Sequence, residues 1–205
     1  MLKILFFSSL LFFITSCGQP DQGWDSYGQD LTNQRFSRIT QINKKNVGEL
    51  ETAWQVKTGV KATFQATPIV HKGIMYVSLP LNNVVALNAK TGDEIWRYEH
   101  ELNPNWNLCC GPSNRGVAIK GKQLFFGTVD ARLISLNIKT GEKIWDVNVV
   151  KNTVQTESIN DLDQSDSNSE KKISGGTGVG ISMAPIVYKG KVIIGITGVG
   201  YGLHI

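Results

Sequence analysis

Apolar residues beyond position 60 fall into short runs of β-branched and aromatic side chains, separated by turn-forming pairs such as Lys-Gly and Thr-Gly. Such runs between turn signals are typical of antiparallel β-strands. This region lacks the sustained 3.6-residue periodicity of an amphipathic helix. The pattern therefore predicts an all-β fold. The runs expected to carry strands cover residues 67–78, 84–96, 116–128, 133–145 and 184–195.

These runs form a repeating unit. Trp96 and Trp145 close two successive units, and Gly92 and Gly141 precede them at matching offsets. Units of about 40 to 50 residues with several strands and a tryptophan at a fixed place are typical of β-propeller blades. Each tryptophan could be a plain core aromatic or could fill the wedge between neighbouring blades. Because a third unit opens near residue 184, the sequence predicts a partial β-propeller of about two and a half blades.

The first residues predict an exported protein. Lys3 precedes an apolar run from Ile4 to Ile14, which is shorter than the roughly 20 residues that span a bilayer. This run fits a signal peptide over residues 1–16. The following Cys17 stands where a bacterial lipobox places the lipidated cysteine, and residues 17–23 would form a lipid-attached tether. An ordinary signal peptide with an incidental cysteine is the alternative. With the lipid anchor, the expected location is the bacterial cell envelope, on the periplasmic face of a membrane.

Composition limits the partners. The 205 residues include 41% hydrophobic ones, enough for a core, and the net charge of +4 comes from 21 basic and 17 acidic residues without dense Lys/Arg runs. We therefore expect no nucleic-acid partner.

Residues 24–205 form the expected propeller domain, with a disordered polar insertion at about 151–178. A calcium-binding loop is the alternative for that insertion, although it lacks the fixed oxygen spacing and turn glycine of such loops.

The unit ending Ala86-x-Asn88-x-x-Thr91-Gly92-x-x-x-Trp96 is similar to the tryptophan-docking motif of the pyrroloquinoline quinone (PQQ) alcohol and glucose dehydrogenases, whose propellers have eight blades. Residues 24–50 resemble the mature N-terminus of that family. Residues 109–116 resemble its vicinal-cysteine segment, and residues 182–185 with 195–202 resemble a stretch that lines the cofactor. The resemblance covers nearly all of the chain after residue 23, and the chain is expected to be an N-terminal fragment of such a protein.

The resemblance implies a PQQ site. In the family, the two adjacent cysteines form a disulfide that packs against the quinone, and an exported protein permits this bond. Arg115 offers a planar fork of donors for quinone oxygens and a carboxylate, with a surface salt bridge as its alternative role. Asn114 accompanies it in the motif. The implied cofactor-binding residues are Gln65, Cys109, Cys110, Arg115, Ser182, Thr197 and Gly198.

The metal site departs from the family pattern. Where many members have a glutamate ligand for calcium or a lanthanide, this chain has Gly200, which has no side-chain oxygen. Calcium is therefore doubtful, and no metal ligand is assigned. The family's catalytic aspartate belongs to blades that would follow residue 205. Asp130, in an expected hairpin turn, and Asp163, in the insertion, are not candidates for its role.

Three functions remain open. The first is the front wall of the cofactor pocket in a PQQ-dependent dehydrogenase that oxidises an alcohol or a sugar and is inactive as this chain alone. The second is a non-catalytic propeller lipoprotein of the outer-membrane assembly type. The third is a pseudoenzyme. The Cys109-Cys110 pair with Asn114-Arg115 favours the enzyme lineage. We expect the chain to be poorly stable or to aggregate unless a second chain completes the ring.

Overall fold

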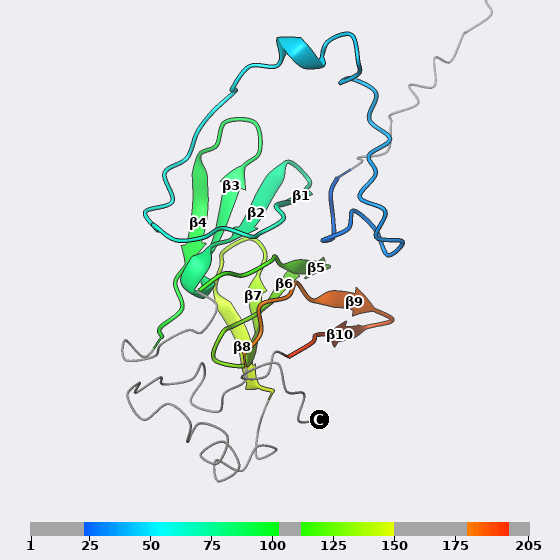
Figure 1. Ribbon diagram of the computed structural model, residues 1–205. Helices are drawn as coiled ribbons and strands as arrows, with labels where there is room; N and C mark the ends of the chain where they lie inside the picture. The colour runs from blue at the N-terminus through cyan, green and yellow to red at the C-terminus, as the bar shows by residue number, and fades with distance from the viewer. Residues whose placement is uncertain (1–22, 103–111, 150–179, 197–205) are drawn as a thin grey trace, which may run out of the picture.

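The computed structural model describes residues 23–102, 112–149 and 180–196. Its first sheet is formed by the antiparallel strands β1 (Ile69–His71), β2 (Ile74–Ser78), β3 (Val84–Asn88) and β4 (Glu94–Tyr98), in that order. We call this sheet blade 1; Figure 1 shows it in green tones. The two predicted runs at 67–78 and 84–96 thus become four consecutive strands.

The second sheet, blade 2, has the same order. It contains β5 (Ala118–Lys120), β6 (Gln123–Gly127), β7 (Arg132–Asn137) and β8 (Lys143–Asn148). A third, two-stranded sheet pairs β9 (Ile186–Tyr188) with β10 (Lys191–Ile193), and β9 lies beside β5 (Figure 1). Two four-stranded blades and the start of a third confirm the predicted all-β partial propeller.

The described residues contain two 3-10 turns, η1 (Val47–Glu49) and η2 (Pro80–Asn82), and no α-helix. Within these residues, accordingly, no helix is long and apolar enough to cross a membrane. The predicted signal peptide, Cys17 and the whole predicted insertion lie outside the described residues.

The two blades share one apolar core. It contains Ile69, Tyr76 and Val84 from blade 1, and Leu124, Phe126 and other residues from blade 2. Trp96 is the main link: its Nε1 donates to the carbonyl of Ile138 at 3.1 Å. The Tyr76 hydroxyl donates to the same carbonyl at 3.3 Å, and the two rings lie 5.9 Å apart. Trp96 therefore fills the wedge between blades, the more specific of its two predicted roles.

The turn that receives Trp96 requires a glycine. Gly141 has φ +73°, and a Cβ there would lie 2.6 Å from Cε3 of the Trp96 ring. The backbone of this turn closes with a 2.8 Å bond from the Gly141 N–H to the Asn137 carbonyl. Gly92 and Asn88 make the same bond, also at 2.8 Å, in the β3–β4 turn. The recurring glycine is thus explained by backbone geometry and by the flat contact with the indole.

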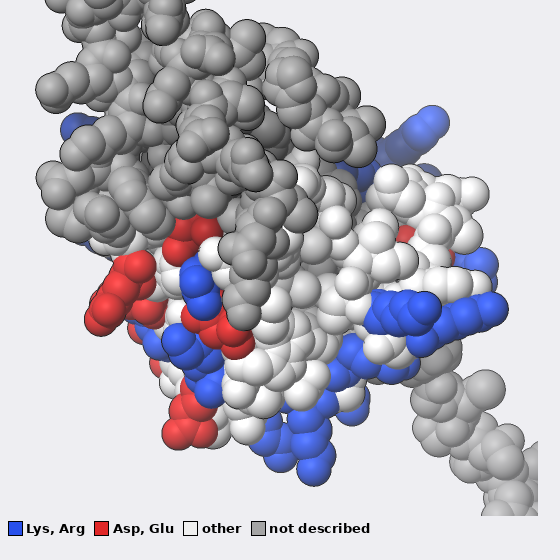
Figure 2. Space-filling view, turned by 90° about the horizontal axis from the view of Figure 1, so that it is seen from below, with Lys and Arg blue, Asp and Glu red and all other residues white. Residues whose placement is uncertain are grey.

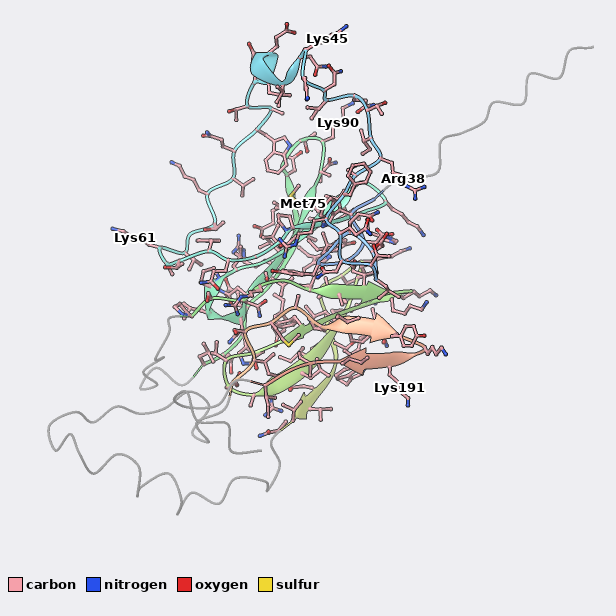
Figure 3. The ribbon with its side chains drawn as sticks, turned by 45° about the vertical axis from the view of Figure 1, so that its right-hand side comes forward. Arg38, Lys45, Lys61, Met75, Lys90 and Lys191 are labelled. Carbon is pink, nitrogen blue, oxygen red and sulfur yellow. The ribbon has the colours of Figure 1, made fainter. Side chains whose placement is uncertain are left out.

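A long segment connects the start of the described chain to blade 1. The backbone of Trp24 exchanges two hydrogen bonds with Val70 of β1. Residues 31–64, which we call the N-terminal arm, then arch away from the sheets and return (blue to cyan in Figure 1). In Figure 3, Arg38, Lys45 and Lys61 mark the arm and point outward. Several large apolar side chains on the arm are also exposed: Leu31, Phe36, Ile39, Ile42, Val47, Leu50 and Phe64.

Charges are unevenly distributed on the face shown in Figure 2. Acidic side chains gather on one side of this face with several basic ones among them, whereas the charged groups on the other side are mostly basic. Two ion pairs brace β8 through Asp146, which contacts Arg132 Nε at 2.6 Å and Lys143 Nζ at 3.3 Å. The first pair joins β7 to β8, and the second lies within β8.

Candidate cofactor site

Three segments that precede the first strand of each sheet lie side by side. The N–H of Thr67, before β1, donates to the carbonyl of Arg115, before β5, at 3.0 Å. The N–H of Arg115 in turn donates to the carbonyl of Ser182, before β9, at 2.9 Å. Backbone bonds therefore join the same edge of three successive sheets, and they bring together Arg115 and Ser182, two of the predicted site residues.

The side chains of these two residues also meet. Arg115 Nη1 donates to Ser182 Oγ at 2.7 Å, and both residues are half-buried. Within the described part of the chain, the Nε and Nη2 groups of Arg115 have no hydrogen-bond partner. A guanidinium has five N–H donors in a planar fork. Most of this donor capacity therefore remains available for a ligand oxygen.

Asn114 holds the backbone on which Arg115 stands. Its Nδ2 donates to the Gly127 carbonyl at 2.7 Å, and its Oδ1 accepts the Gly116 N–H at 2.9 Å. The side chain is buried, with 1% of the residue exposed. The structure thus gives the Asn114 side chain a positioning role, because both ends of its amide are bonded to the protein backbone.

Gly116 allows the three segments to approach closely. A Cβ at this position would lie 3.3 Å from the Thr67 carbonyl oxygen and 3.4 Å from Cβ of Ala184, and its φ of +146° disfavours other residues. Arg115 is therefore followed by a residue that has no room for a side chain.

The other predicted site residues are not joined to this pair. Gln65 is exposed, and no hydrogen bond of its side chain is present among the described residues. Cys109, Cys110, Thr197 and Gly198 lie outside the described residues, as does Gly200. Their assigned roles remain predictions.

A turn missed by the sequence analysis contacts the chain beside the cysteine segment. The N–H of Leu81, in η2, donates to the carbonyl of Pro112 at 2.9 Å. Leu81 and Asn82 have φ of +64° and +63°. The buried Asn82 accepts the N–H of Val129 at 3.1 Å through Oδ1. Proline followed by leucine and two asparagines was the available signal, since proline and asparagine favour turns.

A buried histidine–aspartate pair was also missed. His100 Nε2 lies 3.0 Å from both carboxylate oxygens of Asp130, and its Nδ1 lies 3.4 Å from the Tyr98 hydroxyl. The two side chains are 7% and 9% exposed. Asp130 occupies the β6–β7 turn, where a hairpin turn was expected, so the pair fastens the end of blade 1 to blade 2.

Burial and hydrogen bonding act in opposite directions on Asp130. Burial raises the pKa of its carboxyl, but hydrogen bonds from His100 and Thr128 outweigh that effect and hold the pKa below its ordinary value. Burial also raises the pKa of Tyr98 to about 12, and the nearby carboxylates of Asp146 and Asp130 add to that increase. At neutral pH, Asp130 is charged and the Tyr98 hydroxyl is protonated.

A cavity of about 390 Å³ lies between residues 25–33, β5 and β9, and Arg115 is part of its lining. Asp25 and Asp30 line it as well, whereas Ser182 and Gln65 do not. Two carboxylates would repel an anionic ligand such as PQQ, which carries carboxylates of its own. The cavity therefore does not match the predicted cofactor.

The Arg115–Ser182 pair does fit an anionic quinone. A fixed guanidinium with free donors can bind a carboxylate or a quinone oxygen. The Ser182 hydroxyl accepts from Arg115 and so has its own proton to donate to a ligand. The described residues supply no group of three or more His, Cys, Asp or Glu side chains able to hold a metal ion.

The comparisons with known proteins agree with this architecture. The family model described as the PQQ glucose/ethanol/alcohol dehydrogenase β-propeller domain matches residues 24–200. The quinohemoprotein alcohol dehydrogenase ADH IIB of Pseudomonas putida is 37% identical over 193 residues, which is 93% of this chain and 25% of that protein. The quinohemoprotein alcohol dehydrogenase of Comamonas testosteroni is 34% identical over 194 residues, which is 94% of this chain and 24% of that protein.

Solved structures also match most of this chain with only part of their own length. The crystal structure of the Comamonas testosteroni enzyme superposes with a TM-score of 0.73, covering 89% of this chain and 24% of that one. A europium-containing methanol dehydrogenase, 28% identical, gives 0.67 and covers 86% of this chain and 28% of that one. The chain thus spans about a quarter of the length of the curated relatives it matches. Repeat, fold and family model together show that this chain belongs to the PQQ dehydrogenase β-propeller family.

Proposed function

We propose that this chain forms one wall of the PQQ site of a quinoprotein dehydrogenase that oxidises an alcohol or a sugar. The observation that carries the proposal is the 2.7 Å contact between Arg115 and Ser182, which stand on backbones joined by hydrogen bonds. A charged, half-buried fork with unused donors is suited to a planar anion. The names of the relatives, quinohemoprotein alcohol dehydrogenases, support the choice of cofactor and of substrate class.

Within this wall, the residues have distinct tasks. Arg115 binds and orients the ligand through Nε and Nη2, while Nη1 keeps the Ser182 hydroxyl turned so that its proton points to a ligand oxygen. Gln65 would add an amide, and Thr197 and Gly198 would extend the wall after β10. A disulfide between Cys109 and Cys110 would cover one face of the cofactor. When bound, PQQ supplies the redox chemistry by accepting a hydride equivalent from the substrate.

We also propose that this protein is located in the bacterial cell envelope. A signal peptide over 1–16 and lipid attachment at Cys17 would anchor it to a membrane on the periplasmic side. Further repeats, from a second chain or from a longer protein, would complete the ring. We expect this wall alone to be inactive, because the family's catalytic aspartate would lie in the further repeats and Gly200 has no side-chain oxygen for a metal ion.

A titration with PQQ tests the cofactor assignment. The full chain is titrated with PQQ while tryptophan fluorescence is recorded, and we expect saturable quenching. Arg115→Gln should weaken the affinity by roughly tenfold to a hundredfold, because a hydrogen bond to a charged group contributes about 1.5–3 kcal/mol. Arg38→Gln, in the exposed arm, is the matched control and should leave the affinity unchanged.

Two results would count against the proposal. One is the absence of saturable quenching with the folded wild-type chain, which would favour a propeller scaffold without a cofactor. The other is an equal loss of affinity in Arg38→Gln and Arg115→Gln, which would indicate non-specific attraction of an anion to a basic protein. Circular dichroism of each variant shows whether the sheets are retained.

A further inference from the structure

The hairpins that connect the first two strands of each sheet carry lysines at their tips. The β1–β2 tip contains Lys72, Lys120 and Lys122 flank the β5–β6 tip, and Lys189 and Lys191 flank the β9–β10 tip. All five residues are exposed, and within the described part of the chain no ion pair involves them. We call these five residues the lysine face.

The lysine face lies on the side of the molecule opposite to Arg115. Backbone bonds join the segments that precede β1, β5 and β9 at the Arg115 edge. From that edge β5 and β9 run side by side in the same direction, toward the right of Figure 1. Charged groups on the right of Figure 2 are mostly basic, and Lys191 projects from its sheet in Figure 3.

The other turns on this side of the blades add little net charge. The β3–β4 turn contains Lys90 and Asp93, and the β7–β8 turn contains Lys139 and Glu142. Each lysine is thus balanced by a carboxylate three residues later. The excess of positive charge comes from the first hairpins.

The start of the described chain, which lies beside these hairpins, is balanced as well. Its carboxylates are Asp25 and Asp30, and its cations are Arg35 and Arg38. Asp25 Oδ1 also lies 2.9 Å from Nδ1 of His71, the last residue of β1. These groups leave the charge of the five lysines uncompensated.

The Arg115 side has acidic residues. Because the strands are antiparallel, β4 ends on that side, where it is followed by the exposed Glu99 and Glu101. Asp130, in the β6–β7 turn, lies on the same side. A negatively charged surface would therefore attract the lysine face and repel the opposite side.

The β9–β10 hairpin also has side chains suited to the boundary between water and lipid. Ile186 and Tyr188 are 46% and 48% exposed. Lys189 Nζ lies 5.3 Å from the centroid of the Tyr188 ring. Tyrosine and basic side chains are common at the headgroup level of membranes, because each has an apolar body and a polar end.

The path of the chain brings the predicted lipid attachment to the same side. Trp24 exchanges two backbone hydrogen bonds with Val70, which is two residues before Lys72. Cys17 precedes Gly23 by six residues, and six residues reach at most about 20 Å. A lipid on Cys17 would therefore hold the lysine face close to the bilayer.

We propose that the lysine face lies against an anionic phospholipid bilayer and thereby turns the Arg115 edge away from it. This orientation rests on the proposed location in the cell envelope. A lipid anchor and a basic surface act together, since one holds the protein at the membrane and the other orients it. The cofactor edge then stays open to a dissolved substrate.

Vesicle binding tests the proposal. The full chain carrying Cys17→Ser, which cannot be lipidated there, is sedimented with vesicles of phosphatidylcholine, with or without phosphatidylglycerol. We expect tighter binding to the anionic vesicles and release at high salt. Binding to phosphatidylcholine alone measures the contribution of the apolar run at residues 4–14, which all variants share.

Paired substitutions locate the contact. Lys189→Gln with Lys191→Gln should weaken binding to the anionic vesicles by roughly twentyfold, since each lysine near an anionic surface changes the affinity by about fivefold. Lys45→Gln with Lys61→Gln removes the same charge from the exposed arm and is the matched control. This control should bind as the parent chain does. Circular dichroism reports whether the sheets are retained.

Lysine acetylation gives a second readout. The chain is briefly acetylated with and without anionic vesicles, and each lysine is quantified by mass spectrometry. Lys120, Lys122 and Lys191 should be protected by the vesicles, whereas Lys45 and Lys61 should react as before. This measurement needs no variant of the lysine face, so it does not depend on the folding of one.

Three outcomes would overturn the proposal. The first is equal binding to anionic and zwitterionic vesicles. The second is an equal loss of binding in the two paired variants, or protection of the arm lysines instead of the lysine face. The third is binding to polyglutamate without binding to vesicles, which would make the partner an acidic protein.

Failure here is separable from failure of the proposed function. Mass spectrometry of the chain recovered from bacterial membranes tests lipid attachment at Cys17 directly. The chain carrying Lys189→Gln and Lys191→Gln should still bind PQQ as the wild type does, because these residues lie on the side opposite to Arg115.

Discussion

The Tyr76 side chain is buried in the apolar core that the two blades share, and its hydroxyl makes a hydrogen bond there. Burial raises the pKa of its hydroxyl to about 12, and that hydroxyl donates to the Ile138 carbonyl at 3.3 Å. The folded state therefore binds this proton more tightly than the unfolded state, in which tyrosine has its ordinary pKa of about 10. The stabilisation from the protonated phenol is complete below pH 10 and is lost as the pH rises toward 12.

We predict that this residue contributes to alkaline unfolding. The free energy of unfolding should fall between about pH 10 and 12 in the wild-type chain, and Tyr76→Phe should reduce the slope in that window while lowering stability at neutral pH. Urea unfolding at several pH values measures both effects. An unchanged slope in Tyr76→Phe would contradict the prediction; part of the slope should remain, since the pKa of Tyr98 is raised as well.

Asp130 has the opposite pH dependence. Its folded pKa is lowered, so its stabilising effect is present above the ordinary carboxyl pKa and is lost as the pH falls through the lowered value. We predict that wild-type stability decreases below about pH 4 and that Asp130→Asn removes part of this decrease. Asp25→Asn is the control: Asp25 also contacts a histidine, His71, but its side chain is 56% exposed. Equal effects of the two substitutions would refute the prediction.

At the scale of elements, the contact between Trp96 and blade 2 depends on the β7–β8 turn, in which Gly141 meets two separate requirements. Gly141 has a positive φ and also lies flat against Trp96. Gly121, in the β5–β6 turn, has φ +62° and nothing within 4 Å of a built Cβ. A comparison of Gly121 with Gly141 therefore separates the cost of the left-handed backbone conformation from the cost of a steric clash with the indole.

We predict that Gly121→Ala costs about 1–2 kcal/mol, the penalty of a left-handed conformation for alanine. Gly141→Ala should cost roughly a further 1–3 kcal/mol, because the added methyl overpacks the contact with Trp96. Chemical denaturation followed by circular dichroism gives both values. Equal losses in the two variants would show that the indole adjusts to a methyl group without cost.

The sequence predicted the strands well, because hairpins are encoded locally. The five predicted runs, set by β-branched residues and by Lys-Gly or Thr-Gly turns, contain all or most of each strand from β1 to β10, although β4 and β8 extend past the ends of their runs. The family resemblance pointed to Arg115 and Ser182 as cofactor-binding residues, but their contact with each other was not predicted, since it depends on how blades stack. The His100–Asp130 pair was missed, because it depends on a contact between segments that are distant in the sequence.

At the scale of the whole molecule, the chain presents apolar surface that a closed ring would cover. Exposed apolar side chains extend over the arm, and β9 and β10 add Ile186, Tyr188 and Ile193 at 46%, 48% and 52% exposure. Contiguous exposed apolar surface favours association. Blades 1 and 2 are therefore complete four-stranded sheets, while exposed apolar side chains elsewhere on the described surface favour association.

We predict that the isolated 205-residue chain self-associates in a concentration-dependent manner. Light scattering coupled to size-exclusion chromatography measures the molar mass across a range of protein concentrations. Replacing Ile186, Tyr188 and Ile193 with serine should reduce the association, whereas replacing exposed polar residues of the arm should not. A monodisperse monomer at all concentrations would contradict this prediction.

The backbone bonds from Thr67 to Arg115 and from Arg115 to Ser182 make the two edges of the blades mechanically different. At the first-strand edge, neighbouring blades are joined by main-chain hydrogen bonds. Toward the fourth-strand edge, blades 1 and 2 are held by side-chain contacts, which include the Trp96 indole and the His100–Asp130 pair. A force that separates the blades should therefore move the fourth-strand edges apart first, while the main-chain hydrogen bonds keep the first-strand edges together. Because Arg115 stands on this main-chain edge, separation of the fourth-strand edges would leave the position of its guanidinium nearly unchanged.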